Sequence, residues 1–474
     1  MPAAAERMSR VDTAWLRMDC DANLMMITGV WLLKPKLTLG ELRERVEASL
    51  LPYHRFRQRV VEDTMGANWV DDRRFDLAHH VVAEKLPRQR GAAPREALKH
   101  RVAALCSEPL DAKRPLWQIH LVEDLDGEHS ALISRIHHCI GDGIALISVM
   151  LSITDGGKPP PPRRRKAEPE EEADWLADAV IKPFTDLTVK AIGLSGQGFA
   201  KSVELLANTR PMAGSMDALR IGYQVIGDVA AMALMPDDSP TRLKGKATRG
   251  KKVAWGEPLP LDAVKIVGKA FGCSINDVLL ASVAGAIGDY LRDKGDDTTG
   301  QELRAMVPVN LRPLEQAWKL GNRFGLVPLV LPIGIANPIE RLYAVRRRMA
   351  ELKGSYQPLL AFGVLALSGL MIKPVQAAIT GLFAKKATAV MTNVPGPAQP
   401  LKFCGRTVEQ VMFWVPQSGD IGMGVSILSY GGGVQFGLIT DAKMCPDPDA
   451  IIERFAPQFE QLLLMALMAP WPVE

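Results

Sequence analysis

A histidine pair followed by an aspartate between two glycines is the stretch of this chain best suited to chemistry. The segment Ser134–Gly143 has the sequence Ser-Arg-Ile-His-His-Cys-Ile-Gly-Asp-Gly. An imidazole has an unperturbed pKa near neutrality, so a histidine at a strand end can serve as a general base. Successive side chains of a strand point to opposite faces, so only one of His137 and His138 should reach a substrate. The alternation alone does not decide which one.

The residues on either side predict how this pair is positioned. Ala131–Ile136 is an apolar run that predicts a strand, and Ile144–Leu151 predicts a buried helix. Asp142 has the right type and place to cap the first turn of that helix. Glycine permits backbone geometry that a side chain would forbid, so we expect a tight turn behind the imidazole.

Two less reactive interpretations compete with a catalytic one. A lone histidine is most often a hydrogen-bonded structural residue, and we expect this of the second pair, His79-His80, which lacks the Gly-Asp-Gly turn. A metal site would need ligands beyond His, His and Asp. All eight histidines lie in the first 138 residues, without Cys-x-x-Cys or His-x-x-x-His spacing. We therefore expect no metal.

Composition narrows the class of protein. The chain has 474 residues, 47% of them hydrophobic, and a net charge of +4. No basic stripe interleaved with aromatic residues predicts nucleic-acid binding. The six cysteines are scattered without pattern, which is typical of a reducing cytosol. The first eight residues carry charge and no apolar core, so we expect no signal peptide and a cytoplasmic location.

A membrane contact is a closer question. Leu359–Ile372 and Val375–Ala384 are apolar, and Lys373-Pro374 separates them. Neither piece reaches the roughly 18 residues needed to span a bilayer, and the proline argues against joining them. Two buried helices and a helical hairpin that dips into a lipid surface remain equally open.

The pattern along the chain predicts two α/β halves with a cleft between them. We expect an N-terminal half over 1–157, an exposed proline-rich and charged loop over 158–172, connecting helices over 173–240 and a C-terminal half over 241–474. The predicted strands cover residues 24–33, 118–123, 131–136, 303–312, 324–331, 389–393, 423–430 and 434–440. The predicted helices cover residues 38–51, 144–151, 261–271 and 278–291. A cleft between two halves is a usual place for a site.

The motifs resemble those of known acyltransferases. His-His-x-x-x-Asp-Gly is the signature of a superfamily that includes chloramphenicol acetyltransferase and peptide-synthetase condensation domains. Further stretches resemble the bacterial wax ester synthase/diacylglycerol acyltransferase (WS/DGAT) family, in order and over nearly the whole chain. These stretches are Met8–Met18, Pro115–Trp117, Asn276-Asp277, Pro308–Arg312, Gly321–Gly325 and Thr392–Pro397.

This resemblance implies a fold and a reaction. It implies two halves of mixed sheet, each like chloramphenicol acetyltransferase, with the active site in a tunnel between them. It implies transfer of a fatty acyl group from acyl-coenzyme A (acyl-CoA), a co-substrate with no other cofactor, to a fatty alcohol or to diacylglycerol. Such acceptors imply peripheral association with a membrane or lipid inclusion.

The resemblance also implies residue roles. His138 would be the general base in a motif completed by His137, Asp142 and Gly143, and Asp142 would pair with Arg312 to keep the motif in shape. Asn276 would stabilise the oxyanion. The substrate-binding residues would be Pro115, Leu116, Trp117 and Asp277. Each has a structural alternative: Trp117 could be a core aromatic residue and Asn276 a helix cap.

Several points stay open at this stage. The cations between Arg242 and Lys252 could bind coenzyme A phosphates, but a solvated linker is favoured. A condensation-like enzyme with another acceptor and a non-catalytic lipid-binding or lipid-droplet protein are the alternative functions. The sequence does not choose between wax ester and triacylglycerol as product, and it fixes neither chain-length selectivity nor oligomeric state.

Overall fold

The computed structural model describes residues 5–63, 66–86, 93–158, 235–311, 320–353 and 384–468, together with Ala361, Leu365, Gln376 and Gly381. Apart from their end residues, the predicted loop over 158–172 and the predicted connecting helices over 173–240 therefore lie outside the described residues, and Arg312 lies there too.

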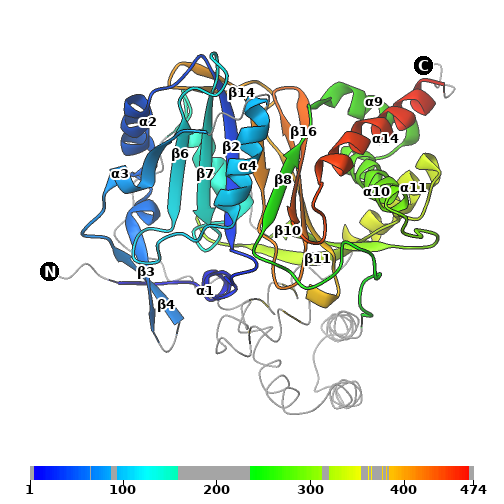
Figure 1. Ribbon diagram of the computed structural model, residues 1–474, viewed down its shortest axis with the longest axis horizontal. Helices are drawn as coiled ribbons and strands as arrows, with labels where there is room; N and C mark the ends of the chain where they lie inside the picture. The colour runs from blue at the N-terminus through cyan, green and yellow to red at the C-terminus, as the bar shows by residue number, and fades with distance from the viewer. Residues whose placement is uncertain are drawn as a thin grey trace, which may run out of the picture.

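Two large sheets stand side by side and form the framework (Figure 1). The first has the strand order β13-β14-β2-β7-β6-β5. Its strands are β2 (Met26–Lys34), β5 (Val81–Glu84), β6 (Trp117–Val122), β7 (Ser130–His137), β13 (Lys402–Phe403) and β14 (Arg406–Trp414). The second has the order β11-β10-β12-β15-β16-β8, with β9 also paired to β16. Its strands are β8 (Lys251–Trp255), β9 (Leu259–Pro260), β10 (Leu303–Asn310), β11 (Phe324–Leu331), β12 (Ala389–Pro395), β15 (Met423–Tyr430) and β16 (Gly433–Asp441).

A small third sheet lies beside the first, with the order β1-β4-β3. Its strands are β1 (Glu6–Arg7), β3 (Gln58–Asp63) and β4 (Gly66–Asp71). All three pair antiparallel, and β1 leads directly into helix α1. This sheet therefore fixes where α1 enters the molecule.

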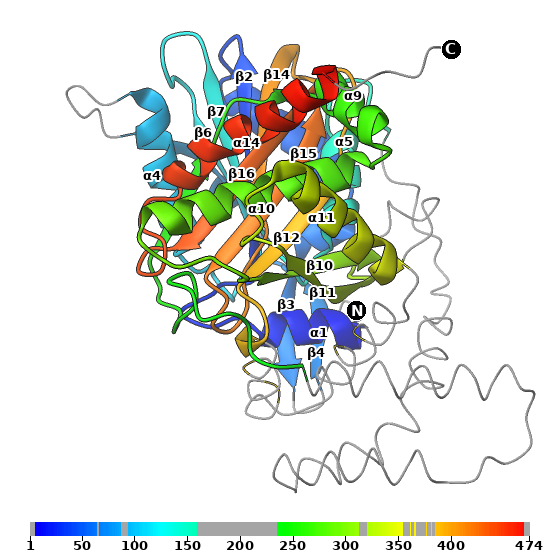
Figure 2. The ribbon, with the colours of Figure 1, turned by 90° about the vertical axis from the view of Figure 1, so that its right-hand side faces the viewer.

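Helices cover the sheets on both sides of the molecule. Those of the N-terminal half are α1 (Arg10–Arg17), α2 (Leu39–Arg45) with a π-helical continuation (Val46–Leu50), a 3₁₀ turn (His54–Arg57), α3 (Leu77–His80), α4 (Pro94–Cys106) and α5 (Gly143–Ser152). Those of the C-terminal half are α9 (Leu261–Phe271), α10 (Ile275–Asp293), α11 (Pro338–Lys353) and α14 (Asp449–Met468). Figure 2 shows α10, α11 and α14 together over one face of the second sheet.

The described strands and helices confirm the predicted α/β class and its two sheet-rich halves. The boundary between the halves is less simple than the sequence suggested, because β13 and β14 come from the C-terminal part of the chain but join the first sheet. β14 pairs antiparallel with β2, with Met412 opposite Val30. The C-terminal part of the chain thus supplies two strands of the first sheet, opposite its own sheet.

Helix α10 is the centre of the C-terminal core. Its capping box links Ser274 and Asp277, and nearly every residue from Asp277 to Leu291 is buried. Within the described part of the chain, no single helix has the length and apolar content to cross a bilayer. The bent pair α9–α10 passes that test jointly, but its apolar residues belong to the packed core.

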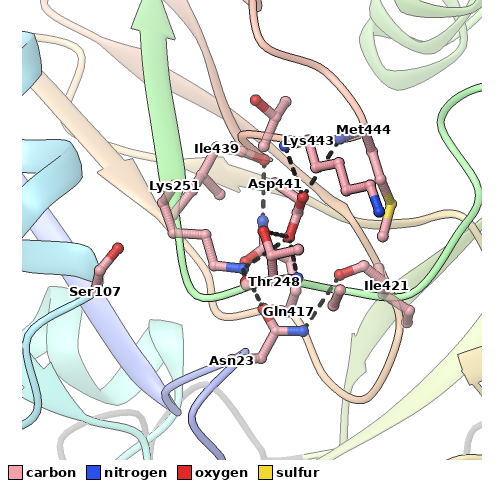
Figure 3. Close-up of polar contacts among 12 residues, drawn as sticks. Asn23, Ser107, Thr248, Lys251, Gln417, Ile421, Ile439, Asp441, Lys443 and Met444 are labelled. Carbon is pink, nitrogen blue, oxygen red and sulfur yellow. Dashed lines mark hydrogen bonds and ion pairs between the residues drawn. The ribbon is translucent and has the colours of Figure 1, made fainter.

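A buried polar cluster joins the two halves (Figure 3). The Lys251 ammonium at the start of β8 donates to Asn23 Oδ1 at 2.7 Å and lies 3.9 Å from an Asp441 carboxylate oxygen. Asn23, in the segment that leads into β2, also donates to the Gly419 carbonyl at 2.7 Å. Burial lowers the pKa of Lys251. Because Asn23 contacts both Lys251 and Gly419 of the C-terminal half, the cluster fixes the start of β2 relative to the second sheet.

Candidate active site

A cavity of about 570 Å³ lies between the two sheets. The N-terminal part of the chain contributes wall residues from β2, β7 and α5, and the C-terminal part contributes residues from α10, α11, β10, β11, β12 and β14. Most wall residues are apolar. The polar ones include Ser134, His138, Asn276, Thr392 and Asn393. A long apolar space with a few polar groups suits a substrate with an aliphatic chain and one reacting polar end.

His138 lies in this cavity, directly after β7. Its backbone N–H donates to the Met25 carbonyl at 2.7 Å, which continues the pairing of β7 with β2. Its ring stacks on Trp15 of α1, with centroids 4.1 Å apart, and Phe324 of β11 lies 5.6 Å away. Neither ring nitrogen has a described hydrogen bond, and only Nδ1 is buried from solvent, which leaves Nε2 accessible in the cavity. Nε2 is therefore the nitrogen left for a substrate.

Electrostatics keep this imidazole neutral. Burial lowers the pKa of His138 to about 4, and the neighbouring His137 adds to the lowering. A general base must be unprotonated before it acts, so His138 is in the required form at neutral pH. Its low proton affinity also favours return of the proton to a leaving group.

His137 points elsewhere. It is buried but does not line the cavity. Its Nδ1 accepts the Cys139 backbone N–H at 3.1 Å, and its Nε2 is 3.7 Å from an Asp19 carboxylate oxygen. Strand alternation did not indicate which histidine faces the cavity. In the structure His138 lines the cavity, and His137 lies on the side away from it.

Asp142 holds the loop behind His138 in shape. One carboxylate oxygen accepts the Ala145 N–H at 2.9 Å, the N-cap of α5 that the sequence predicts. The other accepts the Arg323 backbone N–H at 3.1 Å. Gly143, the first residue of α5, lines the cavity. The predicted partner Arg312 lies outside the described residues, so the described contacts of Asp142 are to backbone groups.

A short segment of the C-terminal half clamps this loop. Gly321 donates its N–H to the Ile140 carbonyl at 3.1 Å and accepts the Asp142 N–H at 3.3 Å. It has φ of +105°, a conformation that favours glycine. It also forms an isolated bridge with Gly141, where an added Cβ would lie 3.7 Å from the Gly321 nitrogen and 3.4 Å from Leu320. These are ordinary van der Waals distances, so the bridge joins the two segments without requiring glycine at position 141.

Asn322 connects this clamp to His138 and to α1. Its amide donates to the His138 carbonyl and to an Asp12 carboxylate oxygen, both at 2.7 Å. Its backbone N–H reaches the same Asp12 oxygen at 3.0 Å. Burial raises the pKa of Asp12 to about 6, against the lowering by these hydrogen bonds. Asp12, Asn322 and the His138 backbone form one buried chain of contacts.

Asn276 and Asn393 stand on the wall contributed by the second half. Asn276 is near the start of α10, and its Oδ1 accepts from the Asn393 amide at 2.7 Å. With that oxygen engaged, Asn276 keeps its own amide protons for another acceptor. Its neighbour Asp277 is not on the cavity wall; its carboxylate accepts the Ser274 N–H at 2.8 Å as part of the cap of α10.

The structure does not place Pro115, Leu116 and Trp117 on the cavity wall. All three are buried. The Trp117 indole donates to the Phe56 carbonyl at 2.8 Å and stacks with His80 at 4.5 Å. Leu116 accepts the His137 N–H at 2.9 Å. The position of this motif therefore favours a structural role in the core over the substrate contact we expected, because its side chains and backbone make contacts in the core beside β7.

Two further predicted segments make structural contacts where they are described. Leu365 packs against the cluster that contains Trp15, and Gln376 donates to the Ala14 carbonyl at 2.7 Å. At these two positions the 359–384 segment lies against α1. In the basic stretch, Arg242 pairs with Asp296 at 2.8 Å, and Lys244 donates to the Ala384 carbonyl at 2.7 Å. Among described residues, no group of three His, Cys, Asp or Glu side chains could hold a metal ion.

Sequence reasoning assigned no role to Trp15 and Asn322, which contact His138, or to Asp12, which contacts Asn322. All three residues lie in the Met8–Met18 and Gly321–Gly325 motifs, which indicate the family but not the role of a single residue. Because these residues are far from His138 in sequence, their types alone did not indicate the contact.

Comparison with known proteins agrees with this geometry. The family model of the wax ester synthase/diacylglycerol acyltransferase catalytic domain matches residues 8–279, and that of the WS/DGAT C-terminal domain matches residues 320–463. A Mycobacterium tuberculosis (strain H37Rv) protein named "Probable diacyglycerol O-acyltransferase" is 29% identical over 407 residues, covering 84% of this chain and 82% of the relative. A second protein of that strain, also named a diacylglycerol O-acyltransferase, is 27% identical over 475 residues, covering 96% of this chain and 99% of its own.

Solved structures share the fold. The wax ester synthase/diacylglycerol acyltransferase of Marinobacter aquaeolei VT8 superposes with a TM-score of 0.67 at 20% identity, covering 97% of this chain and 99% of that one. The first condensation domain of the CDA synthetase superposes with a TM-score of 0.58 at 14% identity, covering 99% and 98%. The family matches span most of the chain, and the chain therefore belongs to the wax ester synthase/diacylglycerol acyltransferase family of acyltransferases.

Proposed function

We propose that this acyltransferase moves a fatty acyl group from acyl-CoA to the hydroxyl of a long-chain alcohol or of diacylglycerol, with His138 as general base and no cofactor besides the acyl donor. The observation that carries the proposal is a neutral, buried imidazole with a free Nε2 in an apolar cavity. The names of the relatives supply the two acceptor classes.

The proposed reaction assigns each group a step. His138 Nε2 takes the proton of the acceptor hydroxyl while its oxygen attacks the thioester carbonyl. The tetrahedral intermediate carries a negative oxygen, to which the Asn276 amide donates a hydrogen bond. Collapse breaks the carbon–sulfur bond, and the imidazolium returns its proton to the leaving thiolate. The products are an ester and free coenzyme A, so no further reactant is needed.

The two halves have different tasks in this scheme. The first sheet carries the base at the end of β7, and the second half supplies Asn276 and much of the apolar wall. A base and an oxyanion donor on opposite walls flank the reacting carbon from two sides. Because the cavity is apolar, each polar interaction in it is stronger than it would be in water.

Both acceptor classes are almost insoluble, so we also propose that the protein collects them at a membrane or lipid-inclusion surface without spanning it. The segment 359–384 remains the candidate for this contact outside Leu365, Gln376 and Ala384, which make core contacts. Binding to vesicles, followed by sedimentation, tests the association separately from catalysis.

The deciding experiment supplies the purified protein with radiolabelled palmitoyl-CoA and, in separate reactions, hexadecanol, diacylglycerol and an amine acceptor. Ester formation that is lost in His138→Ala supports the proposal. Amide formation alone would point to condensation-like chemistry, and lipid binding without any product would point to a non-catalytic lipid-binding protein.

A further inference from the structure

A second cleft, of about 720 Å³, lies outside the candidate active site. It is bordered by the end of β4 and the turn that follows, by β3, and by the loop that precedes β6; β3 and β4 are at the lower left of Figure 1. Five cationic side chains line it, from three separate stretches of chain: Arg59, Arg73, Arg74, Lys113 and Arg114. It shares no wall residue with the catalytic cavity.

These cations have no close carboxylate partner among the described residues. Within the described part of the chain, none of the five forms an ion pair with a carboxylate. This contrasts with nearby arginines: Arg55 pairs with Glu6 at 3.0 Å, and Arg7 pairs with Asp63 at 2.6 Å.

Three carboxylates line the same cleft and offset part of its positive charge. Asp72 accepts the Arg74 backbone N–H and Asp111 accepts the Lys113 backbone N–H, both at 2.9 Å. Asp71 lies 2.9 Å from His54. Arg114 donates to the Arg74 carbonyl at 2.9 Å, which joins the two turns, while the side chains of Arg73 and Lys113 have no described hydrogen bond. Five cations against three carboxylates leave the cleft with two excess positive charges, which favour binding of an anion.

The cleft is joined to the catalytic strand by a short rigid path. Arg114 immediately precedes the Pro115–Trp117 motif, in which Leu116 accepts the His137 N–H at 2.9 Å. The same motif is anchored by the Trp117 hydrogen bond to Phe56, three residues before Arg59. The buried Pro115–Trp117 motif therefore has a structural role, because it fixes the position of the basic cleft relative to the end of β7.

We propose that this cleft binds the phosphate groups of a substrate. Guanidinium groups bind phosphate oxygens in pairs with fixed geometry, and a lysine adds a compact charge. Two substrate-linked sources carry such groups: the nucleotide of acyl-CoA and the headgroup of a phospholipid. Acyl-CoA suits two separate cavities, because a flexible pantetheine arm separates its thioester from its phosphates. Naming acyl-CoA rests on the proposed function; the phosphate site itself does not.

Direct binding tests the site without any need for catalysis. The variant Arg73→Gln/Lys113→Gln removes two exposed charges whose side chains have no described hydrogen bond or ion pair, so the fold should persist. Lys269→Gln/Lys402→Gln, equally exposed and equally free of described ion pairs, is the charge-matched control. Calorimetric titration with adenosine 3′,5′-bisphosphate should show affinity weakened about tenfold or more in the first variant and unchanged in the control.

Two further measurements identify the source of the phosphate. If it is coenzyme A, the first variant raises KM for palmitoyl-CoA but not for palmitoyl-pantetheine, which lacks the nucleotide. If it is a headgroup, bisphosphate binding and both KM values stay unchanged, while sedimentation with phosphatidylglycerol vesicles falls relative to phosphatidylcholine vesicles. A variant that matches wild type in bisphosphate binding and in vesicle binding would overturn the proposal. Absence of acyl transfer by the wild type would instead refute the proposed function, and the titration would still decide the phosphate site.

Discussion

The chain contains two pairs of consecutive histidines, His79-His80 and His137-His138, and the structure gives them different roles. His80 lies at the end of α3, with its ring between Phe75 and Trp117 and its Nδ1 2.8 Å from the Trp117 carbonyl. His138 also stacks on a tryptophan, at 4.1 Å, but it lies in the cavity wall with Nε2 unengaged. Burial lowers the pKa of both rings to about 4. Neither burial, stacking nor pKa separates the structural histidine from the catalytic candidate.

The difference is the direction of a free nitrogen and the loop that sets it. After His138 the chain turns through Gly141, Asp142 and Gly143, and the Gly321–Arg323 segment of the other half clamps that turn. After His80 the chain continues into β5, where no turn of this kind occurs. A catalytic histidine is thus recognised by what restrains the backbone behind it.

The largest expected effect is loss of catalysis in His138→Ala. Removing a positioned base should lower kcat by roughly 100- to 10,000-fold. The melting temperature should fall as well, because the variant loses a buried ring that stacks on Trp15 at 4.1 Å, so kcat is compared per folded molecule. Steady-state assays and thermal melts measure the two quantities. Retention of wild-type kcat would remove His138 from the mechanism.

His80→Ala should lower the stability of the protein and leave kcat unchanged. It removes a ring packed between two aromatic side chains, so the free energy of unfolding should fall by about 2–4 kcal/mol. Molecules that remain folded should keep the wild-type kcat. Urea unfolding and assays at low temperature separate the two effects, and a kcat loss as large as that of His138→Ala would contradict the structural assignment.

Asn322→Ala tests the clamp behind His138. It leaves the His138 carbonyl and the buried Asp12 carboxylate without their amide donor, which should cost about 1–3 kcal/mol of stability. It should also lower kcat more than it raises KM, because the ring loses its fixed position. Asn337→Ala is a matched control: Asn337 Oδ1 accepts N–H groups at the start of α11 and does not line the cavity.

A double-mutant cycle sharpens this test. If Asn322 acts mainly by satisfying Asp12, then Asn322→Ala with Asp12→Asn should be less destabilised than the sum of the two single variants. Additive effects would mean that the two side chains act independently.

The smallest expected effect is a loss of stability in acid, to which one histidine of each pair contributes. Burial lowers the folded-state pKa of His80 and of His138 to about 4, below the ordinary histidine value of 6.5. The unfolded chain therefore binds more protons between these values, and stability falls as pH drops from about 6.5 toward 4. Each histidine should cost roughly 1.5 kcal/mol between pH 6.5 and pH 5. Asp12, whose pKa is raised to about 6, acts in the opposite sense.

Urea unfolding at several pH values measures this dependence. Wild type and His80→Ala should converge as the pH falls, because the variant has lost one of the three buried histidines whose pKa is lowered to about 4, the others being His120 and His138. Parallel curves for the two proteins would show that His80 does not titrate differently in the folded and unfolded states.

The sequence by itself determined the local elements around the site. Apolar alternation and runs predicted β7, β10, β11, β15 and β16, and residue type predicted the Asp142 cap that the structure confirms. The motif resemblance identified the family and the two-half fold. These features depend on residues within one or two turns of each other, so a linear pattern contains them.

Only the tertiary structure decided which residues surround His138. The Asn322 amide reaches the His138 carbonyl across 184 residues and Asp12 across 310. β14 completes the sheet of the opposite half, and the Pro115–Trp117 motif lies in the core although its residue types suit a binding wall equally well. Such contacts depend on how two sheets are set against each other. Local propensity does not encode that arrangement, because it arises from burying many apolar faces at once.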